Sequence, residues 1–145
     1  WSTVHSRRTD PLTGLDAPAL ADVTHSVTWI TDRTWRFLTV SSALRYATGR
    51  PFTDVVGTRT TAGVPEPIFG APFGARLPAY TRSDLSASWY RPLGERRAMV
   101  LWGSVSNVFG RDNVMRYRWS PDFGSRAPVL APFNRSLFMG ATLLF

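Results

Sequence analysis

The chain has 145 residues, room for one ordinary domain, and its 43% hydrophobic and 13% aromatic content is too high for a disordered chain. It contains no cysteine, which excludes a disulfide framework and thiolate metal or redox centres. The formal net charge is +7, from 17 basic residues, all of them arginine, and 10 acidic ones. A basic, aromatic-rich chain of this kind could bind nucleic acid, lie on a membrane surface or be embedded in a membrane.

The chain offers no transmembrane helix and no signal peptide. Its longest strictly apolar run lies around Met99–Trp102, far below the ~20 residues of a membrane-spanning helix. The first residues lack the basic and apolar regions of a secretory leader. We therefore expect either a cytosolic protein or an N terminus that is missing or processed.

Six segments alternate apolar and polar residues with the period of two that is typical of strands. In chain order, the predicted strands cover residues 1–8, 23–31, 35–48, 79–91, 98–109 and 135–145. They exceed the mode of ~5–6 residues in soluble proteins and match the ~9–11 residues with which a tilted strand crosses a bilayer. The expected fold class is all-β: an antiparallel up-and-down meander of about six long transmembrane strands within a larger outer-membrane β-barrel. A soluble β-sandwich, which also alternates, stays open as an alternative.

The connections between these strands alternate in length. In chain order they cover residues 9–22, 31–34, 49–78, 92–97 and 110–134, which reads long, short, long, short, long. An outer-membrane barrel has long loops on the outer side and short turns on the periplasmic side. Aromatic residues flank the two short turns (Trp29, Trp35, Trp89, Tyr90), and others lie at the opposite strand ends (Tyr46, Phe52, Tyr80, Phe109). Such a placement is typical of the two aromatic girdles of these barrels.

Four segments carry a resemblance to a known family. Tyr46–Phe52 fits the pattern Y-x-T-G-x-P-[YF], and Leu77–Leu85 fits L-P-x-Y-x-R-x-D-L. Val105–Asn113 contains N-[LV]-F-[ND]-[RK]-x-N, except that Gly110 replaces the usual Asn or Asp. The chain ends in Phe145 with apolar residues at every second position before it. In this order and spacing, the segments make essentially the whole chain resemble the C-terminal part of a TonB-dependent outer-membrane receptor.

The resemblance implies a location in the cell outer membrane and a specific set of partners. Family members have a plug domain inside a barrel of about 22 strands, whereas residues 1–145 offer no plug domain. The implied partners are outer-membrane lipid and lipopolysaccharide, the barrel-assembly machinery, and the remaining barrel strands and plug from the same or another chain. The TonB complex would be reached only through the missing N-terminal part. The resemblance also implies a barrel-assembly signal formed by Leu137, Met139, Ala141, Leu143 and Phe145.

Two groups of residues are candidates for binding. Arg116, Tyr117, Arg118 and Trp119 interleave cations with aromatic rings in an expected extracellular loop. Arginine can contact phosphate or carboxylate in bidentate fashion, so this segment is a hypothetical ligand-binding site, the alternative being a solvated loop that pairs with lipopolysaccharide phosphates. Arg82 and Asp84 lie two positions apart, on one face of a predicted strand. They are interpreted as a charge network facing the barrel lumen.

No catalytic chemistry is expected. His5 and His25 show no metal-ligand spacing, and Glu66 and Glu95 are too isolated for a paired-carboxylate hydrolase. Neither a cofactor nor a bound metal is predicted, and the chain is interpreted as a non-enzyme. The predicted function is uptake of a scarce nutrient, such as a metal–siderophore chelate. The alternatives are a small stand-alone or oligomeric outer-membrane β-barrel with a structural or adhesive role and, third, a soluble basic β domain that binds nucleic acid. The scatter of arginines over loops and strand ends argues against nucleic acid.

Overall fold

The computed structural model describes residues 1–4, 6–9, 14, 16–19, 22–132 and 134–145. The regular elements that it contains are all strands, and the prediction of an all-β, antiparallel fold is confirmed. The strands are β1 (Arg7–Thr9), β2 (Asp16–Pro18), β3 (Ser26–Trp35), β4 (Leu38–Ala47), β5 (Pro51–Phe52), β6 (Val55–Thr61), β7 (Val64–Phe69), β8 (Ala75–Arg76), β9 (Tyr80–Pro92), β10 (Ala98–Ser106), β11 (Val114–Trp119), β12 (Arg126–Leu130) and β13 (Ser136–Leu144). In the part of the chain described, there is no helix long and apolar enough to span a membrane.

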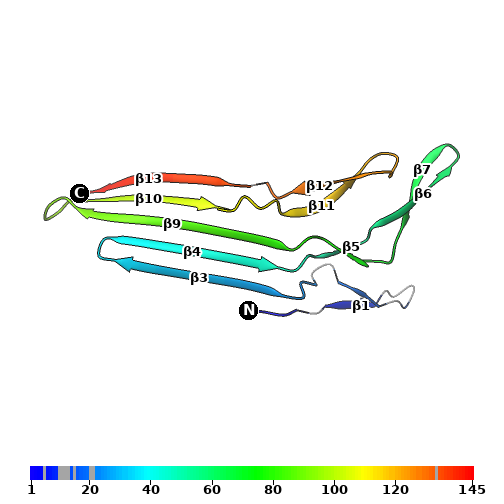
Figure 1. Cartoon of the computed structure of the whole chain (residues 1–145), viewed down its shortest axis with the longest axis horizontal. Coiled ribbons are helices and arrows are strands. Elements are labelled where there is room, and N and C mark those ends of the chain that lie inside the picture. Colours follow the sequence, from blue (N-terminus) through cyan, green and yellow to red (C-terminus); the bar gives the residue numbers. More distant parts are fainter. Residues whose placement is uncertain (5, 10–13, 15, 20–21, 133) are drawn as a thin grey trace. The chain divides into compact units, whose positions relative to one another are not determined.

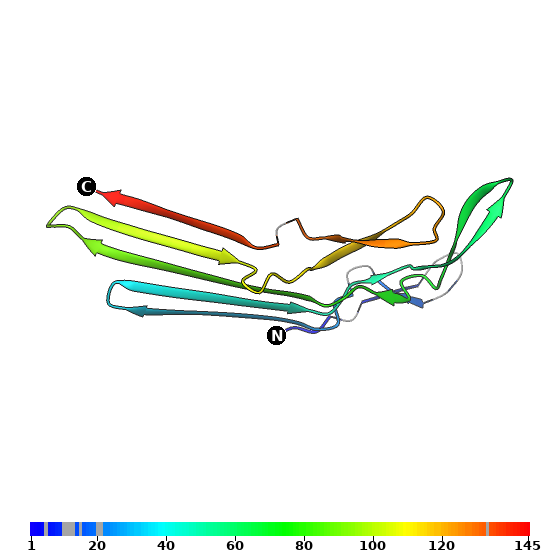
Figure 2. The same ribbon diagram turned by 45° about the horizontal axis from the view of Figure 1, so that its top comes forward.

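The chain divides into two units. Unit 1 comprises residues 1–26, 47–80 and 112–131, and unit 2 comprises residues 27–46, 81–111 and 132–145. Most of unit 2 is a five-stranded sheet with the strand order β13-β10-β9-β4-β3. Figures 1 and 2 show its neighbouring strands running in opposite directions, as tight antiparallel connections require.

The sheet of unit 2 has two chemically different faces. Leu101 of β10 lies opposite Trp89 of β9 and Ala141 of β13, and directly opposed residues point to the same side. The face to which Leu101 belongs is apolar except for Arg91, and over these three strands it consists of Leu85, Ala87, Trp89, Arg91, Met99, Leu101, Gly103, Val105, Leu137, Met139, Ala141 and Leu143. We call it the apolar face. The opposite face combines hydroxyl groups, from Ser86, Ser88, Ser104, Ser106, Ser136 and Thr142, with apolar side chains, from Val100, Trp102, Phe138 and Leu144.

The first turn of this sheet is shorter than the sequence indicates. Residues 31–34, expected as a connection, belong to β3, and the turn consists of Arg36 and Phe37, where Arg36 has a φ of 50°. The Thr34 and Thr39 hydroxyls are hydrogen-bonded at 3.0 Å across this turn. Threonine is β-branched and suits a strand, which explains why the polar stretch continues β3.

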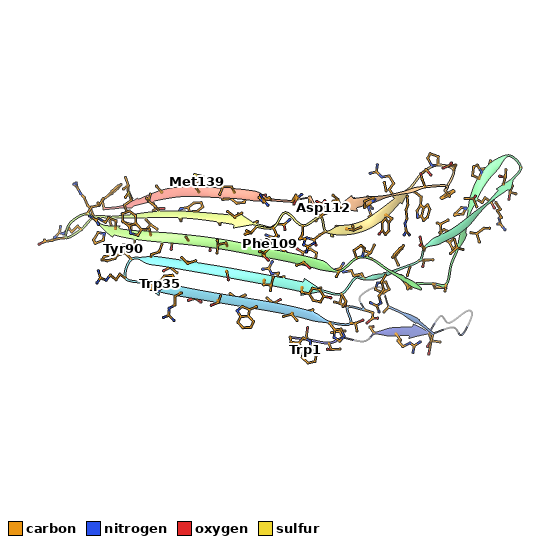
Figure 3. All side chains as sticks on the ribbon, in the orientation of Figure 1. Trp1, Trp35, Tyr90, Phe109, Asp112 and Met139 are labelled. Atoms are coloured by element: carbon orange, nitrogen blue, oxygen red, sulfur yellow. The ribbon has the colours of Figure 1, made fainter. Side chains whose placement is uncertain are left out.

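Two of the aromatic residues labelled in Figure 3 lie at the tight connections of the sheet. Trp35 and Tyr90 lie close to the short turns of the sheet, and Phe109 lies beyond the opposite end of β10. The Tyr90 ring lies 6.3 Å from the Phe37 ring between centroids. Trp29, expected beside a turn, instead lies near the start of β3, because β3 extends past residue 31.

The described residues of the segment 1–8 do not form one long strand. In the described part of this segment, Ser2 makes an isolated bridge with Ser26, and Arg7–Thr9 form β1, which pairs with β2. His5 lies outside the described residues. The long strands of the large sheet are therefore five where six were expected. The run of Ser and Thr in this segment has little apolar surface to bury, so alternation alone is a weak signal here.

Unit 1 contains two-stranded sheets, in segments that the sequence indicates as loops. The pairs are β1-β2, β5-β8, β6-β7 and β11-β12. Ala62 and Gly63 join β6 to β7 with φ values of 51° and 82°. Positive φ at both central residues is the type I′ pattern, whose twist matches that of a hairpin.

Candidate functional site

The motif that begins at Tyr46 and the motif that begins at Leu77 meet in unit 1, where their backbones come into close contact. The Leu77 N–H donates to the carbonyl oxygen of Arg50 at 3.0 Å, and Pro51 pairs with Arg76 where β5 meets β8. A Cβ atom on Gly49 would lie 1.6 Å from the carbonyl oxygen of Leu77. Only glycine fits here, because such a distance is far inside van der Waals contact. Pro51 is fully buried, so the backbone on both sides of Arg50 is held in place.

Arg76 fastens the same region with its guanidinium group. Its Nη2 bonds the Asp22 carboxylate at 2.5 Å, and its Nη1 donates to the carbonyl oxygens of Gly49 at 3.0 Å and Asp22 at 3.2 Å. The Asp22 side chain is buried, and a buried carboxylate needs such charged and hydrogen-bonding partners. Nearby, the His25 N–H donates to Thr48 Oγ1 at 3.1 Å. In this contact with the Tyr46–Phe52 motif, His25 uses its backbone and not its imidazole ring.

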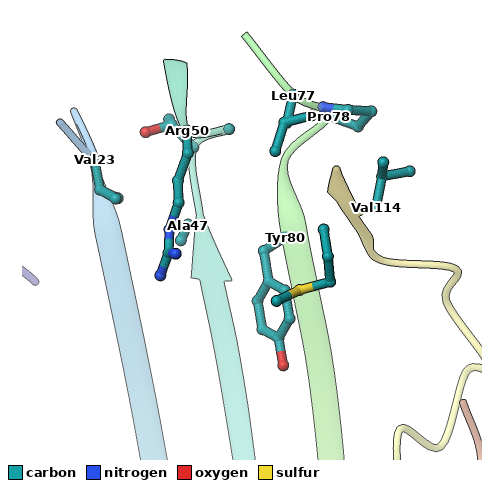
Figure 4. A pocket seen from close by; sticks show the side chains of 10 residues that line it. Val23, Ala47, Arg50, Leu77, Pro78, Tyr80 and Val114 are labelled. Atoms are coloured by element: carbon teal, nitrogen blue, oxygen red, sulfur yellow. The ribbon is translucent and has the colours of Figure 1, made fainter. Parts of the chain in front are cut away.

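The two motifs line a pocket of about 240 Å³, shown in Figure 4. Its lining is mostly apolar, from Val23, Ala47, Leu77, Pro78, Val114 and Met115. Arg50 and Tyr80 add a guanidinium group and a phenol, and Figure 4 shows the Arg50 side chain extended alongside Ala47. We call this the motif pocket.

A second pocket of unit 1 has an aromatic lining. It measures about 380 Å³, and five aromatic residues line it: Phe52, Phe69, Tyr117, Trp119 and Phe123. Among the described residues around it, Arg50 and Arg116 carry charge, and none is acidic. Arg50, Leu77 and Met115 line both pockets, so the two adjoin. We call the second one the aromatic pocket.

The wall of the aromatic pocket is stabilised by a stacked ion pair. Arg126 of β12 donates from Nη1 to both carboxylate oxygens of Asp54, at 2.8 and 2.7 Å. Its guanidinium carbon lies 4.3 Å from the centre of the Tyr117 ring and 5.8 Å from that of Trp119. Tyr117 in turn contacts Phe52, with 5.4 Å between ring centroids. Cation–π and aromatic contacts thus connect β5, β11 and β12.

The predicted binding segment forms β11 and is not a loop. Arg116, Tyr117 and Trp119 line the aromatic pocket, whereas Arg118 lines neither of the two pockets. The segment was predicted to combine its own arginines with its aromatic rings, but the cation stacked on those rings is Arg126. The reason is the hairpin: β12 pairs with β11 and places Arg126 opposite Trp119.

Sequence reasoning missed Arg126, although a signal was present. Ser120–Ser125 reads Ser-Pro-Asp-Phe-Gly-Ser, and Pro, Asp and Gly in this order are typical of a turn. In the structure, the Ser120 hydroxyl and the Gly124 N–H both hydrogen-bond Asp122 and lower the pKa of its carboxyl group. Recognition of this turn predicts two paired strands on either side of it, and so predicts Arg126 across from the aromatic residues.

In unit 2, the structure brings Arg82 and Asp84 together. Arg82 Nε donates to both Asp84 oxygens, at 2.7 and 3.0 Å, and the Asn107 N–H donates to Asp84 Oδ1 at 2.9 Å. Asn107 is itself buried, with a φ of 50°. Its Oδ1 accepts from the Arg111 N–H, and its Nδ2 donates to the Arg111 carbonyl and to Asn134 Oδ1, each at 3.0 Å. The asparagine that begins the third motif therefore closes the turn that follows β10.

The residues of the expected assembly signal lie together at the end of the chain. Leu137, Met139, Ala141 and Leu143 belong to the apolar face of β13, and Phe145 follows the strand. The large ones are strongly exposed, at 62% for Leu137, 71% for Met139 and 95% for Phe145. A continuous exposed apolar surface of this kind is typical of an interaction or membrane surface.

The acidic and histidine residues do not gather into a further site within the described chain. Glu66 bonds Arg59 at 2.8 Å and accepts from the Thr61 hydroxyl at 3.1 Å. Over the described residues, no group of three or more His, Asp or Glu side chains is placed to hold a metal ion. Comparison of the chain with protein-family models, with curated proteins and with solved structures finds no match.

Proposed function

We propose that the chain is the C-terminal portion of a TonB-dependent outer-membrane receptor that takes up a scarce nutrient such as a metal–siderophore chelate. In this proposal, the sheet of unit 2 is part of the barrel wall, and unit 1 supplies the extracellular connections. The observation that carries the proposal is the apolar face, which runs across β9, β10 and β13 with exposed large side chains. Alternating lipid-facing and lumen-facing residues are the defining pattern of a transmembrane barrel strand.

The ends of the sheet also support a larger barrel. β13 and β3 are the terminal strands of the sheet, so each has one neighbour in it. In lipid, an unpaired backbone group costs several kcal/mol, so these edges need further strands. The remaining barrel strands, from the same or another chain, would provide them.

The lengths of the connections agree with the same role. The turn from β3 to β4 has two residues, whereas the connections from β4 to β9 and from β10 to β13 contain hairpins of their own. Barrels of the outer membrane carry short turns on the periplasmic side and long loops outside. Nutrient binding at the pockets of unit 1 would then occur on the outer side.

Membrane insertion is tested with lipids that carry bromine on their acyl chains, which quench the fluorescence of tryptophans in contact with lipid. Trp89 belongs to the apolar face, whereas Trp102 is opposite Ser88, on the other face. We expect quenching to fall strongly in Trp89→Phe and to persist in Trp102→Phe. Equal quenching losses in both variants, or none in the unmodified chain, would contradict insertion in this orientation.

The transport role is tested separately from insertion. Cells with a disrupted gene for this chain are assayed for uptake of labelled ferric chelates, cobalamin and nickel chelates. The proposal predicts a loss of uptake for at least one of them. Normal uptake of all, together with membrane insertion, would instead favour the stand-alone barrel with a structural or adhesive role.

A further inference from the structure

The adjoining pockets of unit 1 are lined by two arginines that form no ion pair with a carboxylate of the described residues. Among the described residues, four arginines form ion pairs with carboxylates, namely Arg59, Arg76, Arg82 and Arg126. Arg50 and Arg116 have no carboxylate within ion-pair distance among the described residues. Arg50 lines both pockets, whereas Arg116 lines the aromatic pocket alone. A cation at the wall of a cavity without acidic lining attracts an anion.

The backbone at Arg50 is held in place before any ligand binds. Gly49 is pressed against the Leu77 carbonyl, and Pro51 is fully buried. The Arg50 carbonyl also accepts the Leu77 N–H. The backbone that carries this arginine therefore has little freedom to lose on binding, which favours affinity.

The aromatic pocket selects the rest of the ligand. Its volume of about 380 Å³ lies within the ~300–1,000 Å³ range of small-molecule sites. Arg126 contacts the rings of Tyr117 and Trp119, and Phe52 packs on Tyr117, so these rings are held by contacts with one another and with Arg126. Aromatic walls favour a flat aromatic ligand through stacked or edge-to-face contacts.

We propose that the two adjoining pockets bind a small aromatic carboxylate, whose acidic group pairs with Arg50 while its ring lies against the aromatic residues of the second pocket. A guanidinium and a carboxylate form a charge-assisted pair with matching geometry. The proposal concerns binding by unit 1 and depends neither on membrane insertion nor on transport, so it fails or stands separately from the proposed function.

The test uses the full chain in detergent micelles and 2-naphthoate as the probe, with binding measured by titration calorimetry. Two comparison ligands separate the two halves of the recognition. 2-Naphthamide keeps the ring system and lacks the charge, and cyclohexanecarboxylate keeps the charge and lacks the aromatic ring. We expect 2-naphthoate to bind at least about tenfold more tightly than 2-naphthamide, the difference that one charge-assisted hydrogen bond supplies. It should also bind more tightly than cyclohexanecarboxylate, which loses the contacts of an aromatic ring with the pocket wall.

Two matched variants locate the anion. Arg50→Gln should weaken 2-naphthoate binding roughly tenfold. Arg118→Gln removes an exposed arginine of the same unit that lines neither pocket and should leave the affinity unchanged. Naphthoate should also change the emission of Trp119, and this change should disappear in Trp119→Phe.

Several outcomes would overturn the proposal. They are an absence of saturable naphthoate binding, equal affinity for the amide, or an unchanged affinity in Arg50→Gln. Inorganic phosphate that displaces naphthoate at equal concentration would reduce the pockets to a general anion site and would also overturn it. The ligand comparisons on the unmodified chain remain decisive even if Arg50→Gln fails to fold.

Discussion

Gly49 allows two segments of backbone, residues 49–51 and 76–77, to lie in close contact. A side chain at this position would collide with backbone, which cannot rotate away. Gly49→Ala should therefore lower the free energy of unfolding by about 3 kcal/mol or more, as expected for an overpacked site. Denaturant titration followed by tryptophan emission measures the loss.

Gly57→Ala is the matched control for this prediction. The added Cβ would meet Ile68 Cδ1 at 3.6 Å, an ordinary contact, and the expected change is within about 0.5 kcal/mol. If Gly49→Ala were as well tolerated as Gly57→Ala, the close approach of Gly49 to Leu77 would be wrong.

Arg126 is the second residue with a specific expected cost. Arg126→Gln removes the ion pair with Asp54 and the stacking on Tyr117, for a loss of about 1–2 kcal/mol in the free energy of unfolding. Arg118→Gln on the neighbouring strand should change it by less than about 0.5 kcal/mol.

A double-mutant cycle isolates the ion pair within that cost. Asp54→Asn and Arg126→Gln share one interaction, so their combined effect should be smaller than the sum of the two single effects. Strict additivity in denaturant titrations would show that Arg126 acts through its ring contacts with Tyr117 and Trp119 and not through the ion pair.

At the residue scale, the sequence predicted pairs that are close along the chain. Arg82 and Asp84 could be placed together because residues two apart share a face of a strand. Arg126 was missed because Asp54 is distant in sequence and because the turn at Ser120–Ser125, which brings Arg126 back to Tyr117, was not recognised. Gly49 and Leu77 belong to two motifs that the sequence shows, but neither motif predicts that the two segments are in contact.

Among the elements, β13 allows the two faces of the sheet to be compared at neighbouring positions. Met139 lies on the apolar face opposite Gly103, and the adjacent Phe138 lies on the other face opposite Ser104. In a lipid-facing position near mid-membrane, an arginine costs about 2–4 kcal/mol. Met139→Arg should thus reduce insertion into lipid vesicles far more than Phe138→Arg.

The two substitutions are matched in depth, because they are consecutive residues of one strand. The measurement is the fraction of chain that becomes resistant to protease after addition to vesicles. Equal insertion of the two variants would mean that the apolar face does not contact lipid.

At the element scale, alternation predicted the long strands better than the connections. The apolar positions of β9, β10 and β13 repeat every second residue, and this signal needs no tertiary information. The hairpins β6-β7 and β11-β12 were missed, because prolines at Pro65, Pro67 and Pro128 lie inside their strands. Proline is tolerated in a two-stranded ribbon, where one edge needs no donor.

For the whole molecule, the end of the chain provides a test of assembly that leaves the fold intact. Phe145 lies beyond β13 and is 95% exposed, so its side chain contributes little to folding. If the assembly machinery captures β13 by strand pairing, deletion of Phe145 should lower the amount of chain in the outer-membrane fraction several-fold.

Trp1→Ala is the control, because it removes a strongly exposed aromatic side chain at the other end of the chain. Membrane-fraction yield is compared at equal total expression. An equal decrease in both variants, or none after deletion of Phe145, would remove the assembly role from this residue.

At the scale of the molecule, the fold class could be predicted from the sequence, but the strands that pair with the two edges of the sheet could not. The five-stranded sheet ends in β3 and β13, and no pattern within the chain specifies what pairs with these edges. Edge pairing depends on backbone groups that every residue has, so side chains carry little information about it.

The type I′ turn at Ala62 and Gly63 has a practical consequence. Nothing lies within 4 Å of a Cβ built on Gly63, and the flanking residues of β6 and β7 are exposed. Lengthening a loop costs little chain entropy, and insertions succeed best at exposed tips. An epitope tag placed between these two residues would therefore leave the close backbone contact at Gly49 undisturbed, and an antibody against the tag would report on which side of a membrane this hairpin is displayed.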